Sequence, residues 1–281
     1  MCRLLGYLGP PISLDILLNQ PEHSLIVQSY QPREMTSAVV NADGFGIGWY
    51  QPNSAKDPFA YKNILPIWSD INLPELSRYI ESGCILANIR SATPGQPIDL
   101  SNCQPFKYGR LLFAHNGFIS NFRQTLYRPI RSQLNDTAYQ LIGGSTDSEH
   151  IFGLLIHHLL AANPQDEDAI ALGMFEGMFN CFEEYMVDAM HSTLMTLTEL
   201  ANSYGVGFSA NVIISNGQQL IASRYSIGSV PPTLYWLRND PNFPDSVIIA
   251  SEPLFSGDWQ SFPEQSILTV KQNLEINFHQ I

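Results

Sequence analysis

Short apolar runs separated by turns that contain Gly and Pro restrict this 281-residue chain to folds rich in β-structure. The runs with the length and residue types of strands are Leu4–Leu8, Gly46–Tyr50, Ile85–Ile89, Leu111–His115, Val212–Ser215, Leu220–Ser223, Thr233–Leu237, Val247–Ala250 and Ile267–Val270. Helical periodicity is confined to blocks, over roughly Pro74–Glu81, Thr146–Leu160 and Glu167–Asn202. Because strands and helices do not alternate regularly, the sequence favours an α+β fold of sheets covered by helix layers over a doubly wound parallel sheet.

The composition narrows the kinds of partner. Apolar residues make up 44% of the chain and charged residues 14%, which is typical of a globular protein with a substantial core. The net charge of −12 disfavours binding to nucleic acid or to an anionic membrane, because both carry negative charge. No apolar run approaches the roughly 18 residues of a membrane span, and the N-terminus has no signal-peptide pattern. We therefore expect a cytoplasmic protein that forms a single domain over residues 2–281.

The second residue of the chain is a candidate nucleophile. If Met1 is removed, Cys2 carries both a thiol and a free α-amine. Their ordinary pKa values are about 8.5 and 8, so the amine can act as a base for the thiol of the same residue. An incidental cysteine is the alternative. The other cysteines have no Cys-x-x-Cys spacing and are expected to be buried thiols rather than metal or redox sites; they are Cys84, Cys103 and Cys181.

Two loops before residue 100 have the composition of a site. The stretch 41–48 contains three glycines within five residues, which lets the backbone approach another backbone or a ligand. It is not a phosphate-binding loop, because no Lys-Ser/Thr follows and no helix begins there. Arg90 follows the apolar run 85–89, and its planar guanidinium suits a bidentate contact with a carboxylate. A structural ion pair of Arg90 is the alternative.

A third motif is His115-Asn116-Gly117, which we expect at a sharp turn where a strand ends. Such a turn could aim the side-chain amide of Asn116 and the backbone N–H of Gly117 at one point. Two convergent donors of this kind form an oxyanion hole. An ordinary Asn-Gly turn is the alternative. His115 is either a catalytic base or a core histidine whose hydrogen bonds are satisfied.

A fourth motif begins the helix expected from Thr146, where Thr146-x-x-Glu149 matches a capping box. Asp147 lies in the first turn. The helix dipole favours an acid there whatever the function, and the same carboxylate could accept hydrogen bonds from an ammonium group. Further along, His157 and His158 are adjacent and diverge by about 100° around the helix, which argues against a metal hydrolase built on them.

The order of these motifs resembles that of the class II glutamine amidotransferases. The resemblance extends from Cys2 to the segment 250–254 and is closest to the stand-alone amidohydrolase branch. It is carried by Cys-Arg-x-Leu-Gly-Tyr-x-Gly at the start, Asp-Gly-Phe-Gly-x-Gly-Trp-Tyr in the glycine-rich stretch, and Ser-Glu-Pro-Leu near the end. Within that branch the chain is most similar to ergothioneine-pathway enzymes, which remove the γ-glutamyl group from γ-glutamyl-hercynylcysteine sulfoxide.

The resemblance implies the N-terminal-nucleophile hydrolase fold, a four-layer αββα sandwich of two mostly antiparallel sheets. It also implies hydrolysis of a γ-glutamyl amide through a thioester, with a small-molecule substrate and with no metal or organic cofactor. The roles that it implies are Cys2 as nucleophile with its own α-amine as base, Asn116 and Gly117 as oxyanion hole, Arg90 and Thr93 as ligands of the substrate α-carboxylate, and Asp147 as ligand of the α-ammonium.

One residue departs from the family pattern. Asn88 stands where family members often carry histidine. Asparagine can still form a hydrogen bond to the neighbouring loop, so we expect an adjustment of the site rather than its loss. The sequence does not identify the leaving amine, which variable loops would contact. The residues that mark such loops are Arg33, Tyr61, Trp236 and Trp259.

Three other functions remain open from the sequence. The chain could be a glutaminase that supplies ammonia to a partner enzyme, although no second core or phosphate-binding loop is left over for an acceptor domain. It could be a glutathione-degrading γ-glutamyl amidase that works in a complex. Either enzyme could also form a homo-oligomer. It could also be a catalytically silent binding module, which a retained Met1 would favour because Cys2 would then lack a free amine.

Overall fold

A computed structural model describes residues 2–35, 40–52, 54, 56–92, 96–162 and 182–281 of the chain. Among these residues the strands form two antiparallel sheets, with the orders β11-β9-β10-β1-β4-β2-β3 and β13-β12-β8-β7-β6-β5. The first sheet contains β1 (Arg3–Ser13), β2 (Phe45–Trp49), β3 (Phe59–Asn63), β4 (Glu81–Ile89), β9 (Tyr235–Asp240), β10 (Phe243–Ala250) and β11 (Gln260–Ser261). The second contains β5 (Phe106–Tyr108), β6 (Leu111–Ile119), β7 (Phe208–Ser215), β8 (Leu220–Ile227), β12 (Ser266–Val270) and β13 (Ile276–Gln280).

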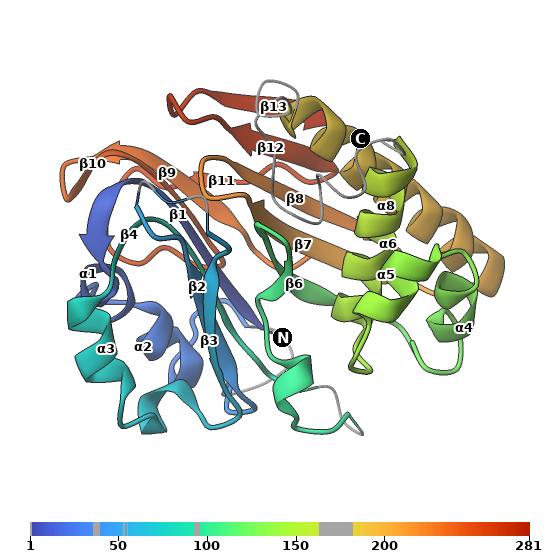
Figure 1. Ribbon diagram of the computed structural model, residues 1–281, viewed down its shortest axis with the longest axis horizontal. Helices are drawn as coiled ribbons and strands as arrows, with labels where there is room; N and C mark the ends of the chain where they lie inside the picture. Colours follow the sequence, from blue (N-terminus) through green and yellow to red (C-terminus); the bar gives the residue numbers. More distant parts are fainter. Residues whose placement is uncertain (1, 36–39, 53, 55, 93–95, 163–181) are drawn as a thin grey trace.

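Helices cover the outer face of each sheet, so the molecule has four layers (Figure 1). The helices over the first sheet are α1 (Leu14–Leu18), α2 (Leu25–Tyr30) and α3 (Leu73–Tyr79). Those over the second are α4 (Tyr127–Arg131), α5 (Asp136–Leu141), α6 (Asp147–Ala162) and α8 (Phe182–Tyr204). None of the helices among the described residues combines the length and hydropathy needed to cross a membrane.

The two-residue period of the strands assigns alternate side chains to different cores. In β1, Leu4 packs between the two sheets, whereas Leu5 and Tyr7 pack against the helices over the first sheet. In β6, Ala114 faces the layer between the sheets, and Phe113 packs against α6 and α8. This alternation matters for the site, because it fixes which residues at the strand ends face the inter-sheet layer.

The α+β fold of two antiparallel sheets with helix layers confirms the expected fold class. Each expected strand is present, and most extend beyond the expected bounds. The helix expected over Pro74–Glu81 ends at Tyr79, because Glu81 begins β4 and pairs with Ser13. The third expected helical block corresponds to α8 from Phe182 onward, and its portion 167–181 lies outside the described residues.

Candidate active site

Cys2 lies immediately before β1, at one end of the layer between the sheets. Because Leu4 faces this layer, the two-residue period places the Cys2 side chain on the same face. The Cys2 thiol is half-buried, and its Sγ lies 4.0 Å from the carbonyl oxygen of Ser91. β1 and β4 are antiparallel, so the start of β1 adjoins the end of β4, where Arg90 follows. The structure thus brings the expected nucleophile close to the segment that carries the expected carboxylate ligand.

A buried ion-pair network holds the start of β1. The guanidinium of Arg3, which is fully buried, lies 3.0 Å from a carboxylate oxygen of Glu252 and donates to the backbone carbonyl of Cys2 at 3.3 Å. The second oxygen of Glu252 lies 2.7 Å from Nε2 of His23. The Ser251 hydroxyl accepts a hydrogen bond from the backbone N–H of Leu4 at 2.9 Å. The Ser-Glu-Pro-Leu segment therefore fixes the backbone beside Cys2, the expected nucleophile.

Replacing Glu252 by glutamine is expected to lower the free energy of unfolding at pH 7 by roughly 3 kcal/mol, because Arg3 would be left buried without its counter-charge. Burial alone would raise the pKa of Glu252. Hydrogen bonds from His23 and from the backbone N–H of Arg33, together with the Arg3 charge, outweigh burial and hold that pKa below its ordinary value. A carboxyl whose pKa is lowered by folding stabilises the protein above its unfolded pKa.

This stabilisation is therefore present at neutral pH and is lost as the pH falls from about 4.5 through the folded-state pKa. Urea unfolding of the wild type and of Glu252→Gln at pH 7 and pH 4 measures this stabilisation. The difference in free energy of unfolding between the two proteins should be smaller at pH 4 than at pH 7. A difference that stays constant over this range would show that the Glu252 charge is not what stabilises the native state. Glu264→Gln is a suitable control, since Glu264 is half exposed in its ion pair with Arg224.

Arg90 is buried but has no carboxylate partner in the described part of the chain. Its guanidinium donates to the carbonyl oxygens of Asp43 at 3.3 Å and Pro97 at 3.2 Å, and to the side chain of Gln96 at 3.4 Å. No Asp or Glu oxygen of the described residues lies within 4 Å of it. The alternative of a structural ion pair is therefore wrong for these residues. The Arg90 charge is available to a carboxylate that enters the site.

The glycine-rich stretch 41–48 binds the backbone of Arg90. Asp43 donates its backbone N–H to the carbonyl of Arg90 at 3.1 Å, and the Arg90 N–H donates to the carbonyl of Gly44 at 2.8 Å. A Cβ at Gly46 would lie only 2.1 Å from the carbonyl oxygen of Gln104. Glycine is needed there because the backbone of β2 runs directly against that of the segment carrying Gln104.

Asn116 and Gly117 do not form the expected turn. Both lie inside β6, which continues to Ile119 and pairs with β7 throughout, so the expectation of a strand ending at a sharp turn is wrong, as is the alternative of an Asn-Gly turn. Because Ala114 faces the inter-sheet layer, Asn116 faces it too, on the same side as Cys2. The Asn116 side chain is fully buried, and neither its nitrogen nor its oxygen has a hydrogen-bond partner among the described residues.

The backbone N–H of Gly117 points to the edge of β6 that β7 leaves open. Along this edge the N–H of His115 is bound by the side chain of Gln104, and the N–H of Ile119 donates to Asp147 at 2.9 Å. N–H groups two residues apart point the same way in a strand, so that of Gly117 lies between these two. A Cβ at Gly117 would lie 2.0 Å from the carbonyl oxygen of Ser209, so only glycine fits.

His115 is a structural residue. It is fully buried, with Nδ1 2.8 Å from the hydroxyl of Ser148 and Nε2 3.2 Å from the carbonyl oxygen of Ser209. Burial lowers its pKa, so the ring is neutral at physiological pH. Both ring nitrogens are engaged in the core, which supports the satisfied histidine over the catalytic base.

Asp147 is the first residue of α6 and is buried. Its Oδ2 accepts the N–H of Ile119, and its Oδ1 accepts the N–H of Ser148 at 2.8 Å. The carboxylate therefore lies beside β6, the strand that contains Asn116 and Gly117, where the free lone pairs of its oxygens can accept further donors. Its expected contact with a substrate ammonium remains a prediction.

The capping box at the start of α6 is only half formed. The Thr146 hydroxyl accepts the N–H of Glu149 at 3.3 Å, as expected of an N-cap. The Glu149 carboxylate binds the N–H groups of Gly143 at 3.0 Å and Gly144 at 2.7 Å instead of returning to the cap. Burial raises the pKa of Glu149 despite these hydrogen bonds. Glu149 thus shapes the loop that leads to Asp147.

Sequence reasoning missed the residues that connect these parts. Asn102 donates to the carbonyl of Pro97 at 3.1 Å and accepts the N–H of Ser145 at 3.2 Å. It therefore ties the segment that binds Arg90 to the loop before Asp147. Gln104 binds the backbone N–H and carbonyl of His115. The polar run Asn102-Cys103-Gln104 in an otherwise Pro-rich loop was the available signal.

Thr93 lies outside the described residues, as does Cys181. Asn88 donates to the carbonyl of Arg3 at 3.3 Å, so its side chain binds β1. The expected hydrogen bond from Asn88 to the neighbouring loop is not formed among the described residues. Among the described residues no cluster of three or more His, Cys, Asp or Glu side chains could hold a metal ion.

Two further thiols are unsuited to nucleophilic chemistry. Cys84 and Cys103 are buried as expected, and burial raises the pKa of Cys84 to about 12 and also raises that of Cys103. A thiol with a raised pKa carries little thiolate at neutral pH. Among the described cysteines, only Cys2 is partly exposed.

Comparison with known proteins identifies relatives of the chain. The family model of class II glutamine amidotransferases matches residues 1–185. The chain is 32% identical to the probable glutamine amidotransferase DUG3 of Saccharomyces cerevisiae, over 97% of this chain and 82% of that protein. It is 28% identical to the γ-glutamyl-hercynylcysteine sulfoxide hydrolase of Mycobacterium tuberculosis, over 97% and 94% of the two chains.

The fold is also shared with a solved structure. The glutamine aminotransferase class-II domain protein from Silicibacter pomeroyi superposes with a TM-score of 0.66 at 22% identity, covering 100% of this chain and 99% of that one. This likeness supports the N-terminal-nucleophile hydrolase fold that the resemblance implied. The family model and the DUG3 relative establish the family. The chain belongs to the class II glutamine amidotransferases.

Proposed function

We propose that the protein is a γ-glutamyl amidohydrolase that uses Cys2 as its nucleophile. The observation that carries the proposal is the buried, unpartnered amide of Asn116, which faces the same inter-sheet layer as Cys2. A buried polar group without a partner costs about 1–3 kcal/mol of stability, so its retention calls for a functional explanation. A donor awaiting a developing oxyanion supplies one.

The proposed reaction begins when the Cys2 sulfur attacks the δ-carbonyl carbon of the γ-glutamyl group, while the α-amine of Cys2 takes the thiol proton, directly or through a water. The carbonyl oxygen becomes an oxyanion that accepts hydrogen bonds from the Asn116 amide and the Gly117 N–H. The carbon–nitrogen bond then breaks as the ammonium returns the proton to the leaving amine. A water attacks the resulting thioester, and glutamate is released with the thiol restored.

Substrate binding uses the charges around this centre. We place the α-carboxylate of the glutamyl group on Arg90, with Thr93, because Arg90 is buried and lacks a carboxylate of the described chain. We place the α-ammonium on Asp147, which lies beside the strand of Asn116 and Gly117. No step needs a metal or an organic cofactor.

For the specific substrate we propose γ-glutamyl-hercynylcysteine sulfoxide, which would yield glutamate and hercynylcysteine sulfoxide in the ergothioneine pathway. The support is the 28% identity to a hydrolase of that name over nearly the whole chain, together with the sequence motifs. The 32% identity to DUG3 favours a second candidate, a glutaminase or glutathione-degrading amidase subunit that works with a partner protein. We propose a cytoplasmic location in either case.

The test is glutamate release by the purified protein, whose loss of Met1 is first verified by intact mass. Free glutamine, glutathione and γ-glutamyl-hercynylcysteine sulfoxide are compared at equal concentrations. Turnover of the sulfoxide alone supports the ergothioneine reaction, whereas preference for glutamine or glutathione supports the second candidate. Release from none of the three, by protein with a free Cys2 amine, would contradict the amidohydrolase and favour a binding module.

Replacing Arg90 by lysine is expected to raise KM at least about tenfold with kcat changed only a few-fold, since lysine keeps the charge but cannot form the bidentate contact. Steady-state kinetics of glutamate release measure both constants. Arg110→Lys is the matched control, because Arg110 is also buried and also donates to backbone carbonyls, those of Ser54, Lys56 and Asn216. An unchanged KM for Arg90→Lys would assign Arg90 a purely structural role.

A further inference from the structure

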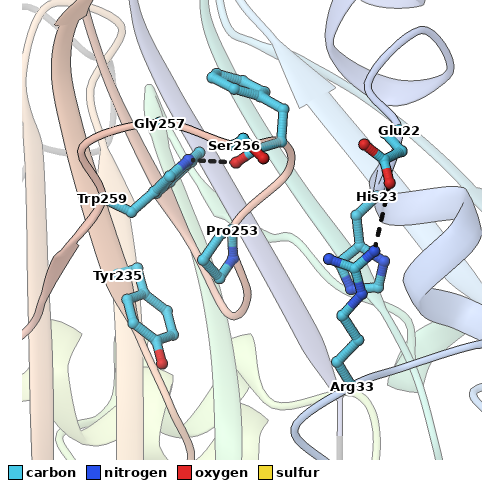
Figure 2. Close-up of a pocket in the computed structure, with 9 residues that line it drawn as sticks. Glu22, His23, Arg33, Tyr235, Pro253, Ser256, Gly257 and Trp259 are labelled. Carbon is cyan, nitrogen blue, oxygen red and sulfur yellow. Dashed lines mark hydrogen bonds and ion pairs between the residues drawn. The ribbon is translucent and has the colours of Figure 1, made fainter.

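A pocket of about 360 Å³ is lined by His23 and Arg33, which both bind Glu252, the ion-pair partner of Arg3 in β1. No step proposed above uses this pocket. One wall carries Tyr235, Trp259 and Pro253, and the facing wall carries Glu22, His23 and Arg33 (Figure 2). Phe255, Ser256 and Gly257 complete the lining. We call this the amine pocket. The leaving group of free glutamine is ammonia, which is about the size of water and fills only about 30 Å³, so the amine pocket has room for a much larger group.

The order of strands places the amine pocket on one side of Cys2 and Arg90 on the other. In the first sheet β1 lies between β4, which leads to Arg90, and β10, which leads to Pro253. Leu5 pairs with Ala250, so continuing the antiparallel register brings Pro253 opposite Cys2. Along the plane of the sheet, the amine part of an amide bond held at Cys2 therefore lies on the Pro253 side when its glutamyl part lies on the Arg90 side.

The carboxylate of Glu252 connects the amine pocket to the nucleophile. One oxygen binds Arg3, which itself holds the carbonyl of Cys2, and the other binds His23 and the backbone N–H of Arg33 at 2.9 Å. The pocket wall and the nucleophile are thus fixed to the same buried group. Their relative position does not depend on a flexible surface contact.

Among the described residues that line the amine pocket, Arg33 supplies a cation and the facing wall is aromatic. The guanidinium of Arg33 is 61% exposed, and its nearest acid is Glu22 at 3.7 Å, itself 79% exposed. An ion pair this exposed contributes little free energy, so Arg33 can exchange Glu22 for a carboxylate of a ligand. On the opposite wall the Trp259 ring is held by its Nε1–H to the carbonyl of Phe255 at 3.1 Å. The Tyr235 hydroxyl donates to Glu34 at 3.0 Å.

We infer that the amine pocket binds the leaving amine of the substrate, with a carboxylate of that amine on Arg33 and its remaining atoms against Trp259 and Tyr235. This inference rests on the proposed γ-glutamyl hydrolysis. It selects amines derived from amino acids or short peptides over ammonia. Of the loop residues that the sequence left unranked, Arg33 and Trp259 line the pocket. Tyr61 binds Asp70 at 2.8 Å, and Trp236 packs on Phe278, so neither lines it.

The test compares kcat/KM for three substrates in Arg33→Ala. Glutathione and γ-glutamyl-hercynylcysteine sulfoxide release amines with a carboxylate, and γ-glutamyl methylamide does not. We expect Arg33→Ala to lower kcat/KM at least tenfold for the first two and far less for the methylamide. The variant keeps the backbone contact with Glu252, so the support of Cys2 is retained. Arg78→Ala is the control, since Arg78 is 64% exposed in an equivalent surface pair with Glu75.

Trp259→Ala distinguishes the two candidate leaving amines, the peptide amine of glutathione and the hercynyl amine of the sulfoxide. A trimethylammonium group is attracted to an indole face, so this variant should affect the hercynyl substrate more than glutathione if the hercynyl amine is the natural one. Equal losses for both would point to the peptide amine. Either pattern, combined with the Arg33 result, supports the amine pocket.

Calorimetric binding of the free amines separates the failure of the pocket from the failure of the proposed function. Cysteinylglycine and hercynylcysteine sulfoxide are titrated into the wild type and into Arg33→Ala. If no substrate is turned over but an amine binds and the variant loses that binding, the hydrolase proposal fails and the amine pocket stands. Equal losses of kcat/KM for all three substrates in Arg33→Ala, or no loss for any, would overturn the amine pocket, as would binding of neither amine to the wild type.

Discussion

Replacing Cys2 by alanine is expected to reduce glutamate release by roughly a thousandfold or more while leaving the fold intact. The Cys2 sulfur is the only protein atom in the proposed mechanism that forms a covalent bond to the substrate carbon, so its removal eliminates the thioester route altogether. The Cys2 side chain has one weak contact, 4.0 Å to the carbonyl oxygen of Ser91, and is half-buried. Its loss should therefore change the free energy of unfolding by less than about 1 kcal/mol.

The measurement combines turnover with urea unfolding of the same preparation. Cys84→Ala is the matched control, because Cys84 is a buried thiol 2.9 Å from the Ser215 hydroxyl and its raised pKa makes it a poor nucleophile. That variant should lose stability through the cavity it creates and keep its kcat. Substantial turnover by Cys2→Ala would refute the nucleophile assignment, and so would equal loss of kcat in both variants.

The base is tested separately by protein that retains Met1. Its Cys2 thiol is intact, but the adjoining nitrogen is then an amide and cannot take a proton at neutral pH. We expect turnover to be lost as in Cys2→Ala, and to return when an aminopeptidase removes Met1. Unimpaired turnover by the Met1 form would mean that another group activates the thiol.

The sequence predicted the central strands and the long helix α6 because their side-chain periods are strong. It did not predict α1, α2, α4 or α5, which have only five or six residues each. One and a half turns are too short to display a helical period, and packing against a sheet stabilises them instead. The short strands β5 and β11 were missed for the same reason, since two or three residues cannot display an alternation.

The sequence proposed candidate site residues, but it did not predict their local geometry. Asn116-Gly117 has a strong local preference for a turn, yet pairing with Asn211 and Ala210 of β7 keeps it in a strand. Only the long-range pairing decides this outcome. The network around Glu252 was missed for a related reason, because His23 and Glu252 are 229 residues apart in the chain. No local pattern identifies which arginine or histidine a buried carboxylate will meet.

Asn116→Ala is the second change with a large expected effect, a fall in kcat of about 10²–10³ with KM nearly unchanged. The Asn116 amide would donate to an oxygen that carries full charge only in the transition state, so its loss affects the chemical step more than substrate binding. The stability should not fall much, because the lost packing of the side chain is offset by removal of two buried polar atoms that have no partners among the described residues. Steady-state kinetics and urea unfolding measure the two effects.

Asn211→Ala is the matched control for Asn116→Ala. It is the cross-strand neighbour of Asn116 and is equally buried, but its Nδ2 donates to the carbonyl of Pro232 at 2.9 Å. Asn211→Ala should therefore lower the free energy of unfolding by about 1 kcal/mol and leave kcat within a few-fold of the wild type. If both variants lose the same fraction of kcat, the effect of Asn116 comes from disturbing β6 and not from a missing donor. A fall in kcat confined to Asn116→Ala, without a matching loss of stability, is what a preorganised oxyanion hole requires.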